Sequence, residues 1–493
     1  MNYKSTPLEQ RFLNGTFLVL LALLICRLIA NYCFPLFDTT EARYAEIARK
    51  MLETGDWITL QQDYGIPFWA KPPLSTWLSA FSMKLLGVNE FAARLPGLLL
   101  SIGVLALVWD LVNKVKGTRI ALISILVLAG TFFFFLDAGA VMTDPALLFC
   151  ITLSCVSFWH AYAFGSKAWS YCFFVGLGLG MLAKGPLAVV LVGLTVFFWV
   201  LFRKEWKNLW QCLPWFSGTL LAALIALPWY ICAEIKTPGF LNYFIVGEHF
   251  QRFLTPGWAG DKYGFAHHAP KGMIWLYAVV GVFPWNILGI KGLIQQRKHL
   301  MTKKQDDGGW VTYLFVWMLV PLLFFTFSSN IIYPYVFPAL PAFAILFSEL
   351  WCRFDADNQR FHWLYAGALI SGVAFLIGSL VIQFIPNLTS STQKPVVTEW
   401  LKTKPQQESK LIYWGYQKPF SAEFYSAGKV MLVKDVVGLC KIISDRRGNY
   451  LVVNSKLIEV LPQELVNQLK HSKVVDFSNG NYFLIENPRL ASC

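Results

Sequence analysis

The chain has 493 residues, of which 56% are hydrophobic and 14% are charged. This composition, with a mean hydropathy of +0.49, excludes a soluble enzyme of this size and indicates an integral membrane protein. The formal net charge of +13 would suit a nucleic-acid-binding surface, but the basic residues fall between apolar segments. We therefore expect membrane lipids around the chain and no nucleic-acid partner.

Apolar runs of about twenty residues, the length of a helix that crosses a bilayer, recur along most of the chain. The predicted spans lie near residues 14–35, 94–113, 118–136, 143–164, 169–186, 187–202, 213–234, 272–291, 309–327, 331–351 and 361–385. In all we expect about 11 to 13 transmembrane helices. The first run has no small-residue cleavage site, so it is interpreted as a retained span and not as a signal peptide.

The basic residues indicate which loops face the cytoplasm. If the N-terminus is cytoplasmic, the basic loops all fall inside, as the positive-inside rule requires. These loops contain Lys114, Lys116, Arg119, Lys167, Arg203, Lys204, Lys207, Lys291, Arg297, Lys298, Lys303, Lys304, Arg353 and Arg360. An odd number of spans then places the unusual polar segments and the end of the chain together on the outer side.

Residues 386–493 differ in character from the rest of the chain. Strand-like segments LIYWG, YLVVN, VVDF and NYFLI alternate there with helix-like ones, a pattern typical of a small α/β domain. Cys440 and Cys493 are its only cysteines, and a disulfide between them would suit an oxidising compartment. We expect this domain to lie outside the membrane.

The first outer loop, residues 36–93, is polar within an otherwise apolar chain. Residues 42–52 combine apolar side chains at helical spacing with charged ones, which predicts an amphipathic helix lying on the membrane. Gly55 is placed to end this helix. A second short helix is expected after Pro73.

Three carboxylates stand at the outer ends of predicted spans. Asp38 and Glu41 follow the first span, and Asp144 in AVMTDPALLF begins the fourth. Each has a structural alternative: Asp38 or Glu41 as an interfacial cap of the next helix, and Asp144 as an N-cap followed by Pro145 at the first helical position. Acids gathered at one membrane face also favour a reaction site.

Lys71 in FWAKPPLSTW and Lys184 in MLAKGPLAVV lie between apolar residues and prolines, where a cation is costly unless it is paired. Snorkelling toward lipid phosphates is the structural alternative for both. Two lysines beside acids at the outer face nevertheless predict a pocket for an anionic group such as a phosphate or pyrophosphate.

The large outer loop, residues 235–271, adds further polar candidates. Glu248 and Arg252 in GEHFQRF have the i,i+4 spacing of a helical ion pair, which surface support alone would explain. His249 and His268 lie in the same loop. Metal binding at His249 has no ligand spacing in its favour.

Six of these segments together resemble one known family. DTTEARYAEIARKMLETGDWITLQ, FWAKPPLSTWL, NEFAARLP, MTDPALLF, AKGPL and EHFQRF resemble, in order, the bacterial polyprenyl-phosphate-sugar glycosyltransferases that include the aminoarabinose lipid A transferases. The chain is more distantly similar to the dolichyl-phosphate-mannose protein mannosyltransferases, which share the membrane-embedded GT-C architecture. The similarity covers about residues 15–345.

The resemblance implies a GT-C transmembrane domain over residues 1–385, in the bacterial inner membrane, with a periplasmic α/β domain after it. It implies an enzyme that moves a sugar from an undecaprenyl-phosphate carrier to an envelope acceptor, with lipid A the first candidate and a glycan or protein the others. Asp38 and Glu41 match the acidic first-loop motif, Lys71 matches the lysine that meets phosphate, and Asp144 matches the second acid.

The chain departs from the family pattern at three places. Thr40 precedes Glu41 where the family often has Asp, which leaves both Asp38 and Glu41 as candidates for the functional acid. Ala70 replaces an acidic residue that, with the histidine, is a metal-site candidate, so a divalent metal, the one cofactor considered, is in doubt. The segment 328–330 lacks the basic residue expected there.

Displacement of a polyprenyl phosphate from a sugar builds positive charge on the sugar and negative charge on the phosphate. Lys71, Lys184 and Arg252 are the candidates to hold the phosphate. Asp38 or Asp144 is the candidate base for a hydroxyl acceptor.

Two other functional classes compete with an enzyme. The first is a transporter or flippase for an anionic lipid-linked sugar, and the second is a structural partner in an envelope complex. The charges gather at one face and not at the bilayer midplane, which favours the enzyme.

Overall fold

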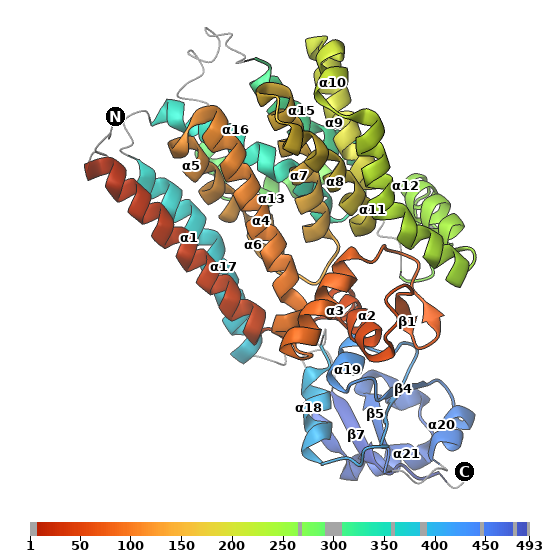
Figure 1. Ribbon diagram of the computed structural model, residues 1–493. Helices are drawn as coiled ribbons and strands as arrows, with labels where there is room; N and C mark the ends of the chain where they lie inside the picture. The colour runs from red at the N-terminus through yellow and green to blue at the C-terminus, as the bar shows by residue number, and fades with distance from the viewer. Residues whose placement is uncertain are drawn as a thin grey trace.

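The computed structural model describes residues 7–264, 269–290, 308–355, 360–384, 392–443, 448–476 and 481–490. Within these residues a helical part precedes a small part that contains a five-stranded sheet (Figure 1). The predicted fold class, a polytopic helical protein with a small C-terminal α/β domain, is confirmed. The predicted boundary between residues 385 and 386 lies outside the described residues.

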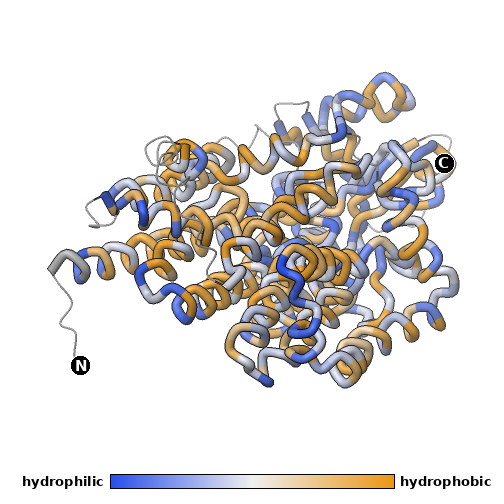
Figure 2. Tube along the Cα trace, turned by 90° about the horizontal axis from the view of Figure 1, so that it is seen from above, coloured by the Kyte–Doolittle hydropathy of each residue, from blue (hydrophilic) through white to orange (hydrophobic). Residues whose placement is uncertain are grey.

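Helices long and apolar enough to cross a membrane dominate the helical part. Six of the described helices meet this criterion, and three shorter apolar helices accompany them. The six fall within α1 (Pro7–Cys33), α4 (Glu90–Lys116), α7 (Asp144–Phe164), α11 (Trp215–Lys236), η2 (Tyr333–Ala339) continued by α16 (Leu340–Phe354), and α17 (Phe361–Phe384). The shorter ones are α5 (Thr118–Ala129), α9 (Leu187–Arg203) and α15 (Trp310–Thr326). Figure 2 shows the hydrophobic character of this part along the chain, and the protein is a multi-pass membrane protein.

The structure confirms one division between predicted spans and corrects two other spans. The predicted division of residues 169–202 is confirmed, because α8 (Lys167–Lys184) and α9 are separate helices with Gly185 at φ +90° between them. The predicted span 118–136 is wrong as one helix, since α5 ends at Ala129 and α6 (Phe132–Asp137) follows after a turn.

Gly130 occupies that turn. A Cβ on Gly130 would lie 2.5 Å from Cα of Ala368, so the close approach of α17 requires glycine there. Likewise the predicted span 272–291 is not one helix: α13 (Met273–Gly281) ends before Pro284.

The first outer loop folds into α2 (Thr40–Thr54), a hairpin of β1 (Gln61–Asp63) and β2 (Ile66–Pro67), and α3 (Leu74–Leu86). Both predicted helices are present, and Gly55 ends α2 in the left-handed conformation at φ 69°. The hairpin was not predicted. In Figure 1 these elements lie between the helical bundle and the C-terminal domain.

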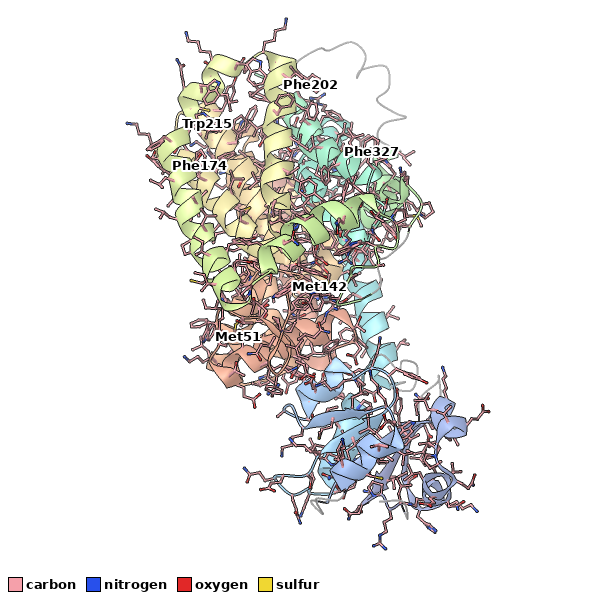
Figure 3. The ribbon with its side chains drawn as sticks, turned by 90° about the vertical axis from the view of Figure 1, so that its right-hand side faces the viewer. Met51, Met142, Phe174, Phe202, Trp215 and Phe327 are labelled. Carbon is pink, nitrogen blue, oxygen red and sulfur yellow. The ribbon has the colours of Figure 1, made fainter. Side chains whose placement is uncertain are left out.

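Three charged side chains of the predicted amphipathic helix, α2, lie inside the protein. Glu46, Arg49 and Lys50 are all buried, because α2 packs against α3 on one side and against α19 (Phe420–Tyr425) of the C-terminal domain on the other. Figure 3 shows Met51 of α2 beside that domain, with Phe202 and Trp215 at the opposite end of the helical part.

The C-terminal sheet has the strand order β4-β3-β5-β7-β6. Its strands are β3 (Leu411–Trp414), β4 (Val430–Val433), β5 (Tyr450–Asn454), β6 (Lys473–Val475) and β7 (Tyr482–Glu486). Strand β3 pairs in parallel with β4 and β5, while β7 is antiparallel to β5 and β6.

Successive residues of β5 point to opposite faces of this sheet, as in any β-strand. Val452 joins the apolar cluster that includes α18 (Lys394–Lys402), and Val453 joins the cluster that includes α20 (Val436–Ile443) and α21 (Gln463–Gln468). Both faces are therefore covered by helices.

Candidate functional site

Glu41 is the first site residue that the fold brings to the membrane helices. It lies in the first turn of α2 and accepts hydrogen bonds from Arg94 of α4 at 2.8 and 2.6 Å. Burial alone would raise the pKa of Glu41, but the Arg94 guanidinium outweighs burial and holds that pKa below its usual value. A second contact, from the Val141 backbone N–H at 3.4 Å, links Glu41 to the segment just before Asp144.

Asp144 and Lys184 form a buried ion pair. Asp144 is the first residue of α7 and Lys184 is the last residue of α8. Lys184 Nζ donates to Asp144 Oδ1 at 2.6 Å and lies 4.8 Å from the centre of the Tyr335 ring. The structure thus unites two residues that the sequence marked separately, and it supplies the partner that a buried cation needs.

Asp137 was missed by the sequence-based reasoning. It ends α6, is 4% exposed, and has Asp144, Arg27, Lys184 and Glu41 as its charged neighbours. Its Oδ2 finds no hydrogen-bond partner among the described residues. The signal was present in the sequence, since an acid that follows four phenylalanines in an apolar run is expensive and usually functional.

Arg27 of α1 was also missed. Its guanidinium is buried and donates from Nε to the Ala138 carbonyl, while Nη1 has no hydrogen-bond partner within the described ranges. A buried cation next to the α6 turn adds positive charge to the same region as Lys184.

His249 lies between the Asp144–Lys184 pair and its sequence neighbour Glu248. Its Nδ1 donates to the Phe244 carbonyl at 2.8 Å, and its Nε2 lies 3.2 Å from the Lys184 carbonyl. Burial lowers the pKa of His249, so the imidazole is neutral near pH 7. The close approach depends on Gly185, where a Cβ would lie 3.0 Å from His249 Nε2.

Lys71, Glu248 and Arg252 form a second network. Lys71 Nζ donates to Glu248 Oε2 at 3.0 Å, and Arg252 Nη1 donates to the same carboxylate at 3.0 and 3.2 Å. Tyr243 adds a hydroxyl donor to Glu248 at 3.2 Å. One acid therefore holds two cations together, one from the first outer loop and one from the second.

Burial and charge act in opposite directions on this network. Burial alone would raise the pKa of Glu248, but Lys71 and Arg252 outweigh it, so that pKa lies below its ordinary value. Burial likewise opposes the charge of Arg252, but Glu248 outweighs it and raises the pKa of Arg252. Lys71 and Arg252 keep side-chain exposures of 19% and 23%, which leaves their charges accessible to a ligand.

The helix that carries Glu248 and His249 is a π-helix, η1 (Asn242–Gln251), an element often found at functional sites. The turn at 328–330, which lacks the expected basic residue, has a different function here. Its Asn330 side-chain amide donates to the Arg252 carbonyl, and to the Thr255 carbonyl at 3.2 Å. The turn thus braces residues 252–255, which directly follow η1.

Asp38 lies away from these charges. Its carboxylate accepts from the Ser421 N–H at 3.0 Å and from the Ser421 hydroxyl. Burial raises the pKa of Asp38, although the hydrogen bonds from Ser421 oppose that rise. Asp38 and Asp144, two of the acids expected at one membrane face, have separate partners: Asp144 faces Lys184, and Asp38 faces the C-terminal domain.

The residues present do not fit a metal centre at His249. Ala70 occupies the position of the expected acid, and both ring nitrogens of His249 face backbone carbonyls. Over the described ranges no group of three His, Cys, Asp or Glu side chains is arranged to hold a metal ion. His268 lies outside the described residues.

Comparison with known proteins now adds independent findings. A family model described as dolichyl-phosphate-mannose-protein mannosyltransferase matches residues 16–244. The crystal structure of ArnT from Cupriavidus metallidurans bound to undecaprenyl phosphate has a TM-score of 0.77 at 17% identity, and the alignment covers 97% of this chain and 98% of that one. The chain therefore shares the fold of that ArnT structure over nearly its whole length.

Two bacterial proteins that are similar to this chain carry the same activity in their names. The undecaprenyl phosphate-alpha-4-amino-4-deoxy-L-arabinose arabinosyl transferase of Edwardsiella ictaluri is 29% identical over 331 residues, which are 66% of this chain and 57% of that protein. A relative with the same activity in its name, from Pseudomonas fluorescens, is 29% identical over 398 residues, 78% of this chain and 66% of that protein. The matched part of the chain thus spans less than two thirds of either relative.

A more distant structure also shares the fold. The apo oligosaccharyltransferase of Archaeoglobus fulgidus has a TM-score of 0.55 at 12% identity, covering 91% of this chain and 70% of that one. The resemblance inferred from the sequence motifs is confirmed as a similarity in sequence and in fold. The apolar helices and this shared fold make the chain a multi-pass membrane protein.

Proposed function

We propose that this protein is a glycosyltransferase that moves a sugar from an undecaprenyl-phosphate donor to an acceptor in the cell envelope. The observation that carries the proposal is the pair of cations, Lys71 and Arg252, held on the single carboxylate of Glu248. Two fixed, partly exposed cations suit a phosphate that gains negative charge as the sugar leaves.

Each candidate has a role in this proposal. Lys71 and Arg252 bind the donor phosphate, with Glu248 holding them in place. Lys184 adds a third positive charge from the acid side of the site, through its pair with Asp144. His249, being neutral, packs beside the Lys184 backbone and carries no charge to the phosphate.

The acids lie on the other side of Lys184. Asp144 and the unpartnered Oδ2 of Asp137 are the groups placed to accept a proton if the acceptor is a hydroxyl. If the acceptor is a lipid phosphate it is already ionised, and the same acids orient the sugar. Glu41 is committed to Arg94 and serves to hold the loop.

Lipid A is the first acceptor to test and 4-amino-4-deoxy-L-arabinose the first sugar, because the relatives' names specify that sugar. A related lipid, a glycan or a protein is the next acceptor in order. The cell experiment is a mass profile of envelope lipids and glycans with and without the protein. A missing sugar mass on one envelope component supports the proposal, and identical profiles contradict it.

We further propose that the site and the C-terminal domain face the periplasm, with the transmembrane domain ending near residue 385. The first outer loop and the C-terminal domain occupy the same end of the helical part, while Phe202, near the basic segment at Arg203, lies at the other end (Figure 3). Cys440 is disulfide-bonded, which suits an oxidising compartment. Its predicted partner, Cys493, lies outside the described residues.

A further inference from the structure

We propose that helix α19 of the C-terminal domain positions the turn before Glu41, so that Glu41 holds the first outer loop against Arg94 and against the segment just before Asp144. The C-terminal domain then contributes to the geometry of the proposed active site. The consequence for transfer rests on the proposed function, whereas the contact itself rests on geometry alone.

Two side chains of α19 hold the two ends of the segment 36–38. Tyr425 Oη accepts from the Leu36 backbone N–H at 2.7 Å and donates to Glu90 at 3.0 Å. Ser421 donates from its backbone N–H and its hydroxyl to Asp38. A short helix from near the end of the chain therefore fixes the connection between α1 and α2.

The same connection is braced from the membrane side by Arg94. Its guanidinium donates to the Phe34 and Pro35 carbonyls at 2.6 and 2.9 Å, and to both oxygens of Glu41. The segment 36–38 thus lies between Arg94 and α19. If α19 releases the segment, Arg94 alone holds Glu41, and the Val141 contact just before Asp144 loosens with it.

A buried ion-pair cluster sets the register of α19 on α2. Glu423 has a side-chain exposure of 1% and lies 2.9 Å from Lys50 of α2 and 2.8 Å from Lys418. Lys418 also reaches Asp63 of the hairpin at 2.7 Å. Apolar packing alone permits small shifts, but any shift here would leave a buried charge without its partner, which is costly.

Tyr425→Phe is the sharpest test, because it removes one hydroxyl and keeps the ring in the core. In the purified full chain we expect the Leu36 amide to exchange with deuterium faster, and the peptide covering residues 34–41 to report it. The matched control is Tyr450→Phe, which removes a hydroxyl inside the same domain, where Tyr450 bonds to Thr403 and Glu486. It should leave that peptide unchanged.

In the transfer assay we expect Tyr425→Phe to lower kcat about 10-fold, a moderate misplacement effect. The donor KM should change little, because the phosphate-binding cations are untouched. In a Glu41→Gln background Tyr425→Phe should cause no further loss if α19 acts through Glu41. If Tyr425→Phe lowers kcat by the same factor in the Glu41→Gln background, α19 only stabilises the protein and the inference is wrong.

Ser421→Ala, which removes the other contact with the segment, gives a second variant if Tyr425→Phe does not fold. Unchanged exchange of residues 34–41 in the folded variant overturns the inference whatever the activity. If the wild-type protein transfers no sugar, the proposed function is contradicted. The hydrogen-exchange result alone then tests the inference.

Discussion

The Nζ of Lys184 lies 2.6 Å from the Oδ1 of Asp144, so that the last residue of α8 and the first residue of α7 share one buried ion pair. The Lys184 carbonyl in turn faces His249, the neighbour of Glu248 in η1. This pair connects the acids near α6 with the cations of the two outer loops, and it is the structural centre of the proposed site.

Asp144→Asn should lower the transfer rate at least ~100-fold, which is the effect of losing one preorganised electrostatic contact. It should also destabilise the protein by about 3 to 5 kcal/mol, because Lys184 loses its partner while still buried. Transfer of labelled sugar and thermal unfolding in detergent measure the two effects.

The control is the double variant Asp144→Leu with Lys184→Met. Replacing both partners of a buried pair by apolar groups is often neutral for stability. We expect this variant to recover the unfolding temperature and to remain inactive. Recovery of both would show that the pair is structural only.

Lys71→Ala should lower turnover ~100-fold, because the leaving phosphate loses a fixed cation. Lys71→Arg should recover part of the loss, since the planar guanidinium cannot reproduce the position of an ammonium. The measurement is steady-state transfer by purified protein.

Lys236→Ala is the matched control for Lys71→Ala. Lys236 makes a 2.7 Å pair with Asp56 in the same region, but its side chain is 50% exposed, and such pairs contribute little. Equal losses in the Lys71 and Lys236 variants would remove Lys71 from the phosphate site.

Sequence patterns predicted those parts of the fold that depend on local order. The apolar runs predicted most of the long helices, and Gly55 predicted the end of α2. The pairing of Lys50 with Glu423 was not predictable, because no local pattern links residues so far apart in the chain. The charged face of α2 therefore looked like a solvated surface, although α19 covers it.

The candidate site was predicted in its residue types but not in its pairings. Lys71 and Lys184 stood out as cations that need partners, yet the sequence could not show that Glu248 serves one and Asp144 the other. Asp38 matched the family motif and is bound to Ser421 instead. Asp137 belongs to none of the motifs, although an acid in an apolar run already indicates a functional residue.

Acidification should destabilise the protein through His249. Burial depresses its folded-state pKa, so below the ordinary histidine pKa of about 6.5 the unfolded chain binds a proton that the folded chain does not. Stability is then present above that pH and is lost as the pH falls toward the depressed pKa. His249→Gln should flatten this slope in unfolding scans across that range.

His471→Gln is the control for the pH measurement, since His471 is exposed. It should leave the slope as in the wild type. A slope that survives in His249→Gln would assign the acid sensitivity to other groups.

The C-terminal domain should report a periplasmic location in cells. We expect a C-terminal alkaline phosphatase fusion to be active and a C-terminal fusion to a protein that fluoresces only in the cytoplasm to be dark. We also expect intact Cys440 to resist alkylation until a reductant is added, because it is disulfide-bonded. The opposite pair of reporter signals would reverse the topology.

The most direct test of the account is transfer by the purified full chain in detergent, with a labelled undecaprenyl-phosphate sugar as donor and lipid A as acceptor. Detergent has no two sides, so a flippase alone yields no product in this assay. We predict labelled acceptor with the wild-type protein and a loss of about 100-fold with Lys71→Ala. Labelled product that is unaffected by Lys71→Ala, or no product from any donor sugar and envelope acceptor tried, would contradict the account.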